Sequence, residues 1–207
     1  HYYLADLFNE NEAPVSAATK QSELADFGKS VFDAINAGDP EGTWVMQGWL
    51  FYNNRQFWDK ESVKALLSKV PNERMMIIDL ANEEFHGWEQ LDGFFGKPWI
   101  YSTIHNYGGN SQMIGNLPLY AKDAPEMLAN PRKGKVVGFG LSPEGVQNNE
   151  VVYELLTDVA WSQKPIDIKA WLQNYIKQRY GAEDQDLFTA WMDLLESVYS
   201  SPVVHPT

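Results

Sequence analysis

The sequence of 207 residues contains no cysteine, which excludes disulfides and thiolate metal sites. Its four histidines show no paired spacing typical of zinc sites, so we predict no metal and no cofactor. Basic residues are also scarce, because 16 lysines and arginines face 28 acidic residues and leave a net charge of −12. Such a chain offers no basic surface to phosphates, and no apolar run is long enough to cross a bilayer. We therefore predict neither a nucleic-acid partner nor a membrane span.

Motifs for phosphate binding and for a serine nucleophile are absent as well. The stretch VVGFGLSPEG contains Gly-x-Gly after an expected strand, but Pro143 stands where a dinucleotide-binding motif needs its third glycine. The basic stretch RKGKV lacks the spacing of a phosphate-binding loop. No G-x-S-x-G sequence is present. What remains as the chemistry to examine is that of carboxylates.

Aromatic residues, by contrast, are abundant: they make up 14% of the chain and include 8 tryptophans and 10 tyrosines. Aromatic side chains are large core fillers, and an excess of tryptophan also suits flat ligands such as sugars. With 44% hydrophobic residues, the composition is typical of a globular protein.

Expected strands and helices alternate along most of the chain. Short apolar segments predict five strands, over residues 1–8, 43–52, 74–81, 97–110 and 135–145. Apolar residues at three- and four-residue spacing predict helices over residues 16–37, 59–70, 148–161, 166–181 and 186–200. This alternation predicts a parallel sheet. Only helices are expected beyond residue 165, so we predict an α/β domain over residues 1–163 and an α-helical domain over residues 164–207.

Polar and aromatic residues gather where the expected strands end. In chain order these ends carry Asn9 and Glu10, Gly48 and Trp49, Asp79, His105 and Asn106, and Pro143 and Glu144. In a (β/α)8 barrel, functional side chains occupy the carboxyl ends of several successive strands. An open doubly wound sheet concentrates them at one switch point instead. The pattern favours an α/β fold of the (β/α)8 TIM-barrel type.

Three of these strand-end residues carry carboxylates: Glu10, Asp79 and Glu144. A pair of carboxylates that flank a bond is typical of glycoside hydrolysis, where one is the acid/base and the other the nucleophile or base. Each also has a structural alternative: a solvated acidic loop for Glu10, a helix cap for Asp79 and a turn before a helix for Glu144. We interpret Glu12 as part of a solvated loop, and Glu83 and Glu84, in ANEEFHGWEQ, as surface charge.

Five blocks of the sequence resemble the α-N-acetylglucosaminidases of glycoside hydrolase family 89. In chain order they are HYYLADLFNE, WVMQGWLF, MMIIDL, IHNYGGN and SPEGVQNNEVVYELLTDVAW, and WLQNYIKQRYG follows them. The resemblance implies a glycosidase whose (β/α)8 barrel is followed by an α-helical domain. It also implies that this chain carries roughly the last five strands of the barrel, so we expect it to be part of a longer polypeptide.

The resemblance implies Glu10, in FNE, as the acid/base and Glu144, in PEG, as the nucleophile. It implies that Trp49 lines the sugar pocket, together with four other side chains: Asp79, Leu80, His105 and Asn106. Asn9 precedes the acid/base, and we expect it near the 2-position of the sugar. The implied substrate is a glycan that ends in α-linked N-acetylglucosamine, heparan-sulfate-like or mucin-type, and the implied location is extracytoplasmic. A TIM-barrel glycosidase of other sugar specificity and a non-catalytic carbohydrate-binding scaffold are the alternatives.

An α-linked N-acetyl sugar constrains the mechanism. Its 2-acetamido group lies cis to the leaving group and cannot reach the back face of the anomeric carbon. A carboxylate of the enzyme must then attack, and the natural result is a retaining reaction through a covalent glycosyl-enzyme. We therefore predict that the carboxyl groups of Glu10 and Glu144 lie about 5–5.5 Å apart.

Overall fold

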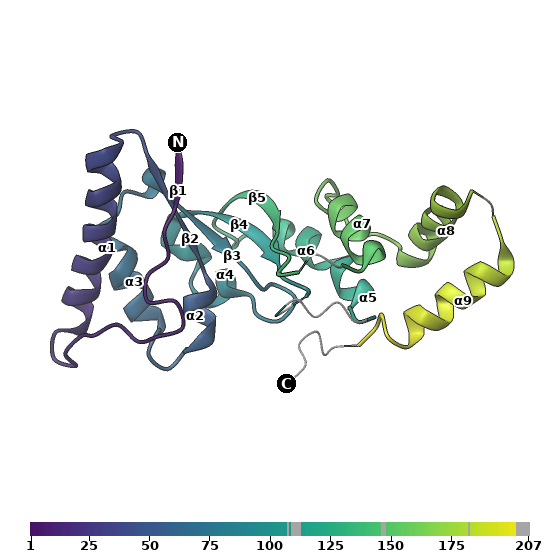
Figure 1. The fold of residues 1–207 in the computed structure, drawn as a ribbon, viewed down its shortest axis with the longest axis horizontal. Helices are drawn as coiled ribbons and strands as arrows, with labels where there is room; N and C mark the ends of the chain where they lie inside the picture. The colour runs from purple at the N-terminus through teal and green to yellow at the C-terminus, as the bar shows by residue number, and fades with distance from the viewer. Residues whose placement is uncertain (107, 109–112, 146–147, 182, 202–207) are drawn as a thin grey trace. The chain divides into compact units, whose positions relative to one another are not determined.

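In the computed structural model, residues 1–106, 108, 113–145, 148–181 and 183–201 are described (Figure 1). The chain divides into two compact units, and each is described by itself. The first unit takes in residues 1–103 and 131–140, and the second takes in the described residues of 104–130 and 141–207. The predicted domain boundary between residues 163 and 164 stays a prediction.

The first unit is built on a five-stranded sheet. Its strands are β1 (Tyr2–Leu4), β2 (Thr43–Gln47), β3 (Met75–Asp79), β4 (Pro98–Thr103) and β5 (Lys135–Leu141, whose last residue belongs to the second unit). They lie in the order β1-β2-β3-β4-β5, and the pairs from β1 to β4 are parallel. A strictly sequential order contains no switch point, which an open doubly wound sheet would need. The sheet is therefore an arc of a (β/α) barrel, as the sequence predicted.

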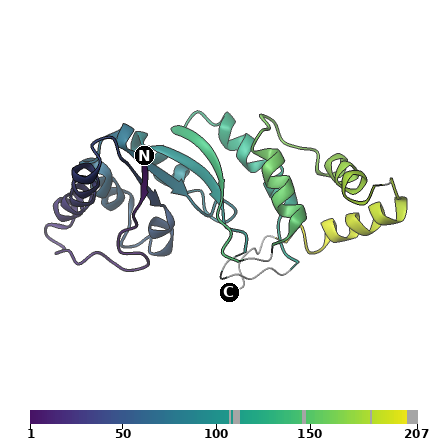
Figure 2. The same ribbon diagram turned by 45° about the horizontal axis from the view of Figure 1, so that its top comes forward.

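Helices α1 (Lys20–Gly38) and α3 (Lys60–Ser68) lie side by side next to the sheet (Figures 1 and 2). The Asp59 carboxylate caps α3 by accepting the backbone N–H of Ser62 at 2.8 Å, as its position before the helix predicted. Most residues of β4 are buried, and buried apolar residues alternate along β2 and β3 and repeat at helical spacing on the two helices. The largest of those in β2, β3, β4 and α3 are Trp44, Met46, Met75, Ile77, Trp99, Leu66 and Leu67.

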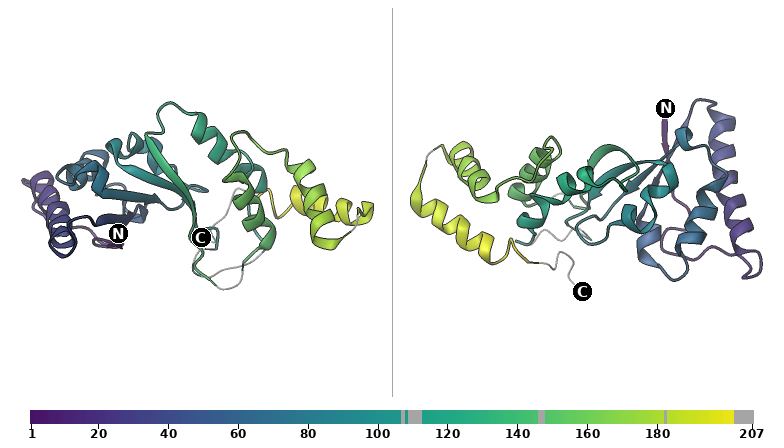
Figure 3. Two further views of the ribbon diagram at one scale, coloured as in Figure 1. Left: turned by 90° about the horizontal axis from the view of Figure 1, so that it is seen from above. Right: turned by 180° about the vertical axis from the view of Figure 1, so that it is seen from behind.

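The second unit is helical. It contains α5 (Leu117–Tyr120), α6 (Asp123–Ala129), α7 (Glu150–Val159), α8 (Ile168–Tyr180) and α9 (Gln185–Glu196). Figure 3 shows α5 beside α7 and α8 beside α9. The predicted end of α8 is confirmed, because Gly181 follows it with a left-handed φ of 75°. The apolar face predicted for α8 is buried at Leu172, Tyr175 and Ile176.

Several predicted strands were too long. The strand expected over residues 43–52 ends at Gln47, and the short helix α2 (Trp49–Asn53) follows, so Trp49 lies on a helix. The strands expected over residues 1–8 and 97–110 end at Leu4 and Thr103, and residues 107, 109 and 110 lie outside the described part. Strand pairing, which apolar composition does not reveal, sets these ends.

Besides α2, five short helices of the described residues were not predicted: η1 (Asn72–Arg74), α4 (Gly87–Gln90), η2 (Gly93–Gly96), α5 and α6. Segments of at most two helical turns are too short to show a clear helical periodicity. Within the described residues, no helix has both the length and the apolar character needed to cross a membrane.

Candidate active site

The loop that carries Glu10 leaves β1 through a strained turn. Phe8 anchors it, because its ring packs on Phe27 at 5.2 Å and on Trp58 at 5.9 Å between ring centroids. Phe8 and Asn9 have left-handed φ values of 59° and 48°, which are costly for residues other than glycine. The chain turns sharply at these two residues and leaves Asn9 and Glu10 exposed at the surface of the unit.

Side chains of α2 and of the residue after it hold this loop. The indole Nε1 of Trp49 donates to Oε1 of Glu10 at 2.9 Å. Asn53 Nδ2 donates to the backbone carbonyl of Glu10 at 3.2 Å, and Asn54 Nδ2 donates to Oε1 of Glu12 at 2.9 Å. The loop is thus fixed at three points, and a hydrogen bond from Trp49 orients the Glu10 carboxylate.

Trp49 also lines a small hollow at the end of the sheet. The hollow is formed by Gly48, Trp49, Tyr52, Asp79, Leu80, Ala81 and Phe85. The Trp49 ring lies 5.0 Å from that of Tyr52, whose hydroxyl donates to Oε2 of Glu84 at 2.9 Å. The structure thus brings Trp49, Asp79 and Leu80 together, and their roles in binding sugar stay predictions.

Asp79 lies buried where β3 ends, with 4% of its surface exposed. Its carboxylate accepts the backbone N–H of Trp88 at 3.0 Å, so it acts as a cap at the beginning of α4. A side chain at Gly87 would meet Oδ1 of Asp79 at 2.5 Å, so the close approach of α4 requires glycine there. Burial raises the pKa of Asp79 to about 7, against the lowering effect of the Trp88 hydrogen bond.

The residues after Asp79 were only partly anticipated. Asn82, which the sequence analysis did not single out, is 1% exposed. Its Nδ2 donates to the carbonyls of Asp79 at 2.7 Å and Ser102 at 3.1 Å, and so joins the ends of β3 and β4. The assignment of Glu83 to the surface was wrong, because only 7% of it is exposed, whereas Glu84 is exposed as expected. The sequence around these two adjacent glutamates does not indicate which of them is buried.

In the second unit, Glu144 is held by the segment that follows β4. The backbone N–H of Glu144 donates to Oδ1 of Asn106 at 2.9 Å. The carboxylate of Glu144 accepts a hydrogen bond from the backbone N–H of Gly108. Glu144 is exposed, whereas Asn106 is fully buried. The structure therefore brings Glu144 and Asn106 together, as the resemblance implied.

His105 directly precedes Asn106 and is 1% exposed, with a left-handed φ of 59°. Its Nε2 lies 3.0 Å from Nδ2 of Asn149, which makes Nε2 an acceptor and places the ring proton on Nδ1. Burial lowers the pKa of His105 to about 4, so the ring is neutral at pH 5 and above. A predicted role in contacting the sugar stays a prediction, and the structure supplies a neutral imidazole.

Two asparagines before α7 belong to this cluster and were not predicted. Asn106 Nδ2 donates to Oδ1 of Asn148 at 2.8 Å, and Asn149 bonds His105 and, at 3.3 Å, the carbonyl of Ile114. In sequence, this pair reads only as the start of a helix, because asparagine is common at that position. Nothing in the spacing indicates that their amides reach back to residues 105 and 106.

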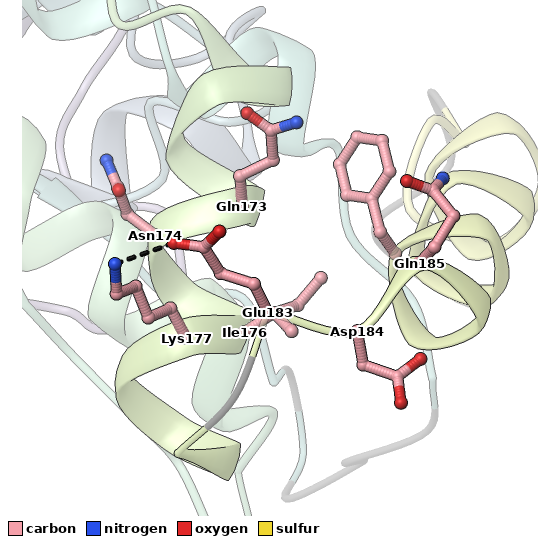
Figure 4. Close-up of a pocket in the computed structure, with 8 residues that line it drawn as sticks. Gln173, Asn174, Ile176, Lys177, Glu183, Asp184 and Gln185 are labelled. Atoms are coloured by element: carbon pink, nitrogen blue, oxygen red, sulfur yellow. Dashed lines mark hydrogen bonds and ion pairs between the residues drawn. The ribbon is translucent and has the colours of Figure 1, made fainter.

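A larger hollow lies within the second unit, between α8 and α9 (Figure 4). Its lining is mostly polar and includes Gln173, Asn174, Gln185 and the ring of Phe188. Two carboxylates line it: that of Asp184 accepts the N–H of Leu187 at 2.9 Å, and that of Glu183 is paired with Nζ of Lys177 at 2.6 Å. This hydrogen bond holds the pKa of Glu183 below its usual range, so it is a poor proton donor.

The predicted site residues therefore fall into two groups. Asn9, Glu10, Trp49, Asp79 and Leu80 lie in the first unit, and His105, Asn106 and Glu144 lie in the second. The predicted distance between the carboxyl groups of Glu10 and Glu144 runs from one unit to the other, so it stays a prediction. The described residues contain no group of three or more histidines and acids placed to hold a metal ion.

Comparisons with known proteins agree on one family. The family model of the alpha-N-acetylglucosaminidase (NAGLU) tim-barrel domain matches residues 1–163. The chain is 37% identical to the human alpha-N-acetylglucosaminidase over 201 residues, which is 97% of this chain and 26% of the human protein. It therefore spans about a quarter of the length of that relative.

Solved structures of a family 89 glycoside hydrolase from Clostridium perfringens are also similar. The complex with 2-acetamido-1,2-dideoxynojirmycin has a TM-score of 0.80 at 26% identity, covering 96% of this chain and 21% of the bacterial one. A variant with two glutamates changed to glutamine, bound to its substrate GlcNAc-α-1,4-galactose, has a TM-score of 0.79 at 25% identity, covering 95% and 20%. With the barrel arc and the strand-end glutamates, these matches show that the chain belongs to the alpha-N-acetylglucosaminidases, glycoside hydrolase family 89.

Proposed function

We propose that the polypeptide containing this chain is a retaining exo-glycosidase that removes terminal α-linked N-acetylglucosamine from glycans. Glu10 is the acid/base and Glu144 is the nucleophile. The observation that carries the proposal is that each glutamate follows a barrel strand and that a protein N–H donates to its carboxylate. Such fixed carboxylates are what a double displacement at a sugar carbon needs.

The relatives support the substrate class. The Clostridium perfringens relative binds GlcNAc-α-1,4-galactose as its substrate in a variant that lacks two glutamates. The human relative is an alpha-N-acetylglucosaminidase. The heparan-sulfate-like or mucin-type aglycone and the extracytoplasmic location belong to the same proposal and rest on the family resemblance.

In the proposed first step, a carboxylate oxygen of Glu144 attacks the anomeric carbon while Glu10 donates a proton to the leaving oxygen. The bond to the aglycone breaks, and a covalent glycosyl-enzyme forms at Glu144. In the second step, Glu10 takes a proton from water, which attacks the same carbon and releases Glu144. Two inversions give net retention. The cis arrangement of the 2-acetamido group and the leaving group supports this route over attack by the substrate's own amide.

A panel of p-nitrophenyl glycosides tests the substrate class with the complete polypeptide. We expect hydrolysis of the α-N-acetylglucosaminide and little reaction with α-glucoside, β-N-acetylglucosaminide or α-N-acetylgalactosaminide. Hydrolysis of another member would indicate a different glycosidase, and hydrolysis of none would indicate a binding scaffold. Proton NMR of the first product tests the mechanism, because retention releases the α-anomer and inversion releases the β-anomer.

A further inference from the structure

We propose that Asn106 is a positioning residue for Glu144: its amide fixes the turn that carries the nucleophile and acts on the reaction through that turn. The inference rests on the proposed function, in which Glu144 attacks the sugar. The family resemblance implied a contact between Asn106 and the sugar. The contacts of Asn106 within the second unit point to a different role.

Glu144 lies on a segment that needs an anchor. It follows the end of β5 at Leu141 in a stretch without helix or strand, and its side chain is exposed. An exposed glutamate on such a segment can adopt many rotamers, and only some of them place its carboxylate for attack on the sugar. Contacts that select one rotamer therefore favour the reaction. The protein must therefore hold both the backbone and the carboxylate of Glu144.

A chain of amide hydrogen bonds holds the backbone. Asn106 Oδ1 accepts the N–H of Glu144 at 2.9 Å, and Asn106 Nδ2 donates to Oδ1 of Asn148 at 2.8 Å. Asn148 Nδ2 then donates to the carbonyl of Gly145 at 3.2 Å. The two asparagines thus bind the backbone at two points around Glu144, Asn106 at its own N–H and Asn148 at the carbonyl of the following residue, Gly145.

Burial makes the first of these contacts rigid. Asn106 has no exposed surface in the second unit. A buried amide is costly to leave unpaired, so its hydrogen-bond geometry is strongly specified. The hydroxyl of Tyr153 adds a donor to Oδ1 of Asn106 at 3.4 Å. A fully enclosed amide is placed to hold protein groups.

The same segment also holds the carboxylate. Gly108, two residues beyond Asn106, donates its backbone N–H to Oε2 of Glu144. Residues 106 and 108 thus fix the Glu144 backbone and one carboxylate oxygen, and the other oxygen stays available for attack. A displacement of about 1 Å in such an arrangement can cost roughly 100-fold in rate.

The test uses Asn106→Ala and Asn148→Ala in the complete polypeptide. We expect kcat/KM to fall by roughly 100-fold and roughly 10-fold, respectively, because each variant frees one side of the turn. The fall should be equal for dinitrophenyl and alkyl α-N-acetylglucosaminides, because a displaced nucleophile slows attack on both. The inhibition constant of neutral N-acetylglucosamine, a ligand without the charge of the transition state, should change by less than about threefold, since binding of the sugar is not affected.

Asn116→Ala is the matched control. Asn116 is a half-buried asparagine of the same unit whose Oδ1 accepts the N–H of Leu119 at 3.1 Å, at the beginning of α5. Loss of this cap should lower the melting temperature by a few degrees and leave kcat unchanged. A purely structural role for Asn106 predicts the same pattern for Asn106→Ala, and that pattern would overturn the proposal.

Two further outcomes would also overturn it. An inhibition constant that rises in step with KM, at unchanged kcat, would show that Asn106 contacts the sugar. Crystal structures of the wild type and of Asn148→Ala test the proposal without measuring activity. We expect the Glu144 backbone to differ by about 1 Å between them, and an unmoved backbone would contradict the proposal. Failure of the wild type to cleave the α-glycoside would refute the proposed function instead, and Asn148→Ala serves if Asn106→Ala does not fold.

Discussion

Glu10, in the first unit, receives its hydrogen bond from the side chain of Trp49, whereas Glu144, in the second, receives one from the backbone of Gly108. The side chains that bind the Glu10 loop are exposed or half-buried: Asn53, in α2, and Asn54, directly after it. The side chain that binds the backbone of Glu144, the amide of Asn106, is fully buried. Both carboxylates are therefore oriented by a protein N–H, but the backbone around them is held by different kinds of side chain.

Burial also acts in opposite directions on the neighbouring titratable groups of the two units. It raises the pKa of Asp79 to about 7 in the first unit and lowers that of His105 to about 4 in the second. Both shifts have the same cause, because burial disfavours the charged form of either group. The two units should therefore respond to pH in opposite ways.

The largest expected effect is the loss of activity when the proposed nucleophile is removed, and this loss should not depend on the leaving group of the substrate. Glu144→Ala should reduce kcat by roughly 10⁴-fold or more on every α-N-acetylglucosaminide, because no substrate can replace the nucleophile. Steady-state kinetics with dinitrophenyl and alkyl glycosides measure this. Normal kcat in a folded Glu144→Ala variant would disprove the nucleophile assignment.

Glu10→Ala should behave differently with the same two substrates. Loss of a general acid should cost about 10²–10⁴-fold with an alkyl glycoside, whose leaving oxygen needs a proton. The first step with a dinitrophenyl glycoside should change little, because that leaving group departs without one. Equal losses on both substrates would show that Glu10 is not the proton donor.

Asp79 should make the stability of the wild type fall as the pH rises from about 4 to about 7. In this window the unfolded chain has lost the Asp79 proton and the folded chain keeps it, so the folded state binds more protons. The span of the pKa shift sets an upper limit of roughly 4 kcal/mol on the decrease in the free energy of unfolding across this window. Asp79→Asn keeps an acceptor for the Trp88 N–H and should abolish this slope. Thermal unfolding at pH 4 to 8 measures it, and parallel curves for the two proteins would contradict the shift.

His105 should give the opposite slope. Between about pH 6.5 and pH 4 the imidazole of His105 is protonated in the unfolded chain and neutral in the folded chain. The unfolded state therefore binds more protons, and stability falls as the pH falls through this window. The effect should approach roughly 3 kcal/mol. His105→Asn tolerates the left-handed backbone and does not titrate. Hydrogen exchange of peptides from the second unit should show less acid sensitivity in this variant, and an unchanged profile would rule out a neutral buried imidazole.

The smallest expected effect concerns the link between Trp49 and Glu10. Trp49→Phe keeps an aromatic ring beside Tyr52 and removes the N–H donor, so kcat/KM on an alkyl glycoside should fall by about 10-fold. The loss should be much smaller on the dinitrophenyl glycoside. Asn54→Ala is the control: it loses the bonds of Asn54 to Glu12 and to the N–H of Phe57 but keeps the one from Trp49 to Glu10, so any loss should be equal on both substrates. An equal rise in KM for both substrates would indicate that Trp49 only lines the sugar pocket.

The order of the elements could be predicted because each long element carries a periodic signal. The apolar positions of the helix expected over residues 16–37 and of α8 recur every three or four residues, and MMIID reads as a buried strand. The ends of the strands could not be predicted in the same way. WLFY continues an apolar run, and only the pairing of β2 with its neighbours ends the strand at Gln47 and leaves Trp49 to a helix.

The candidate carboxylates could be found because a parallel sheet places its strand ends at one edge. The residues that support them could not. Asn148 and Asn149 read as the start of a helix, and the inward turn of Glu83 has no counterpart in its sequence neighbourhood. Contacts between residues more than 30 positions apart leave no trace in local periodicity.

From the order of residues alone came the class of fold, because periodicity and strand-end position are local properties of a chain. The resemblance of short sequence blocks gave the family and named Glu10 and Glu144 as the candidate catalytic pair. Only the tertiary structure decided how those glutamates are held. The donors to their carboxylates lie 39 positions from Glu10 and 36 positions from Glu144, and hydrogen bonds over such separations exist only once the chain has folded. The pKa shifts of Asp79 and His105 also depend on the tertiary structure, since burial, which is their main cause, is a property of the packed molecule.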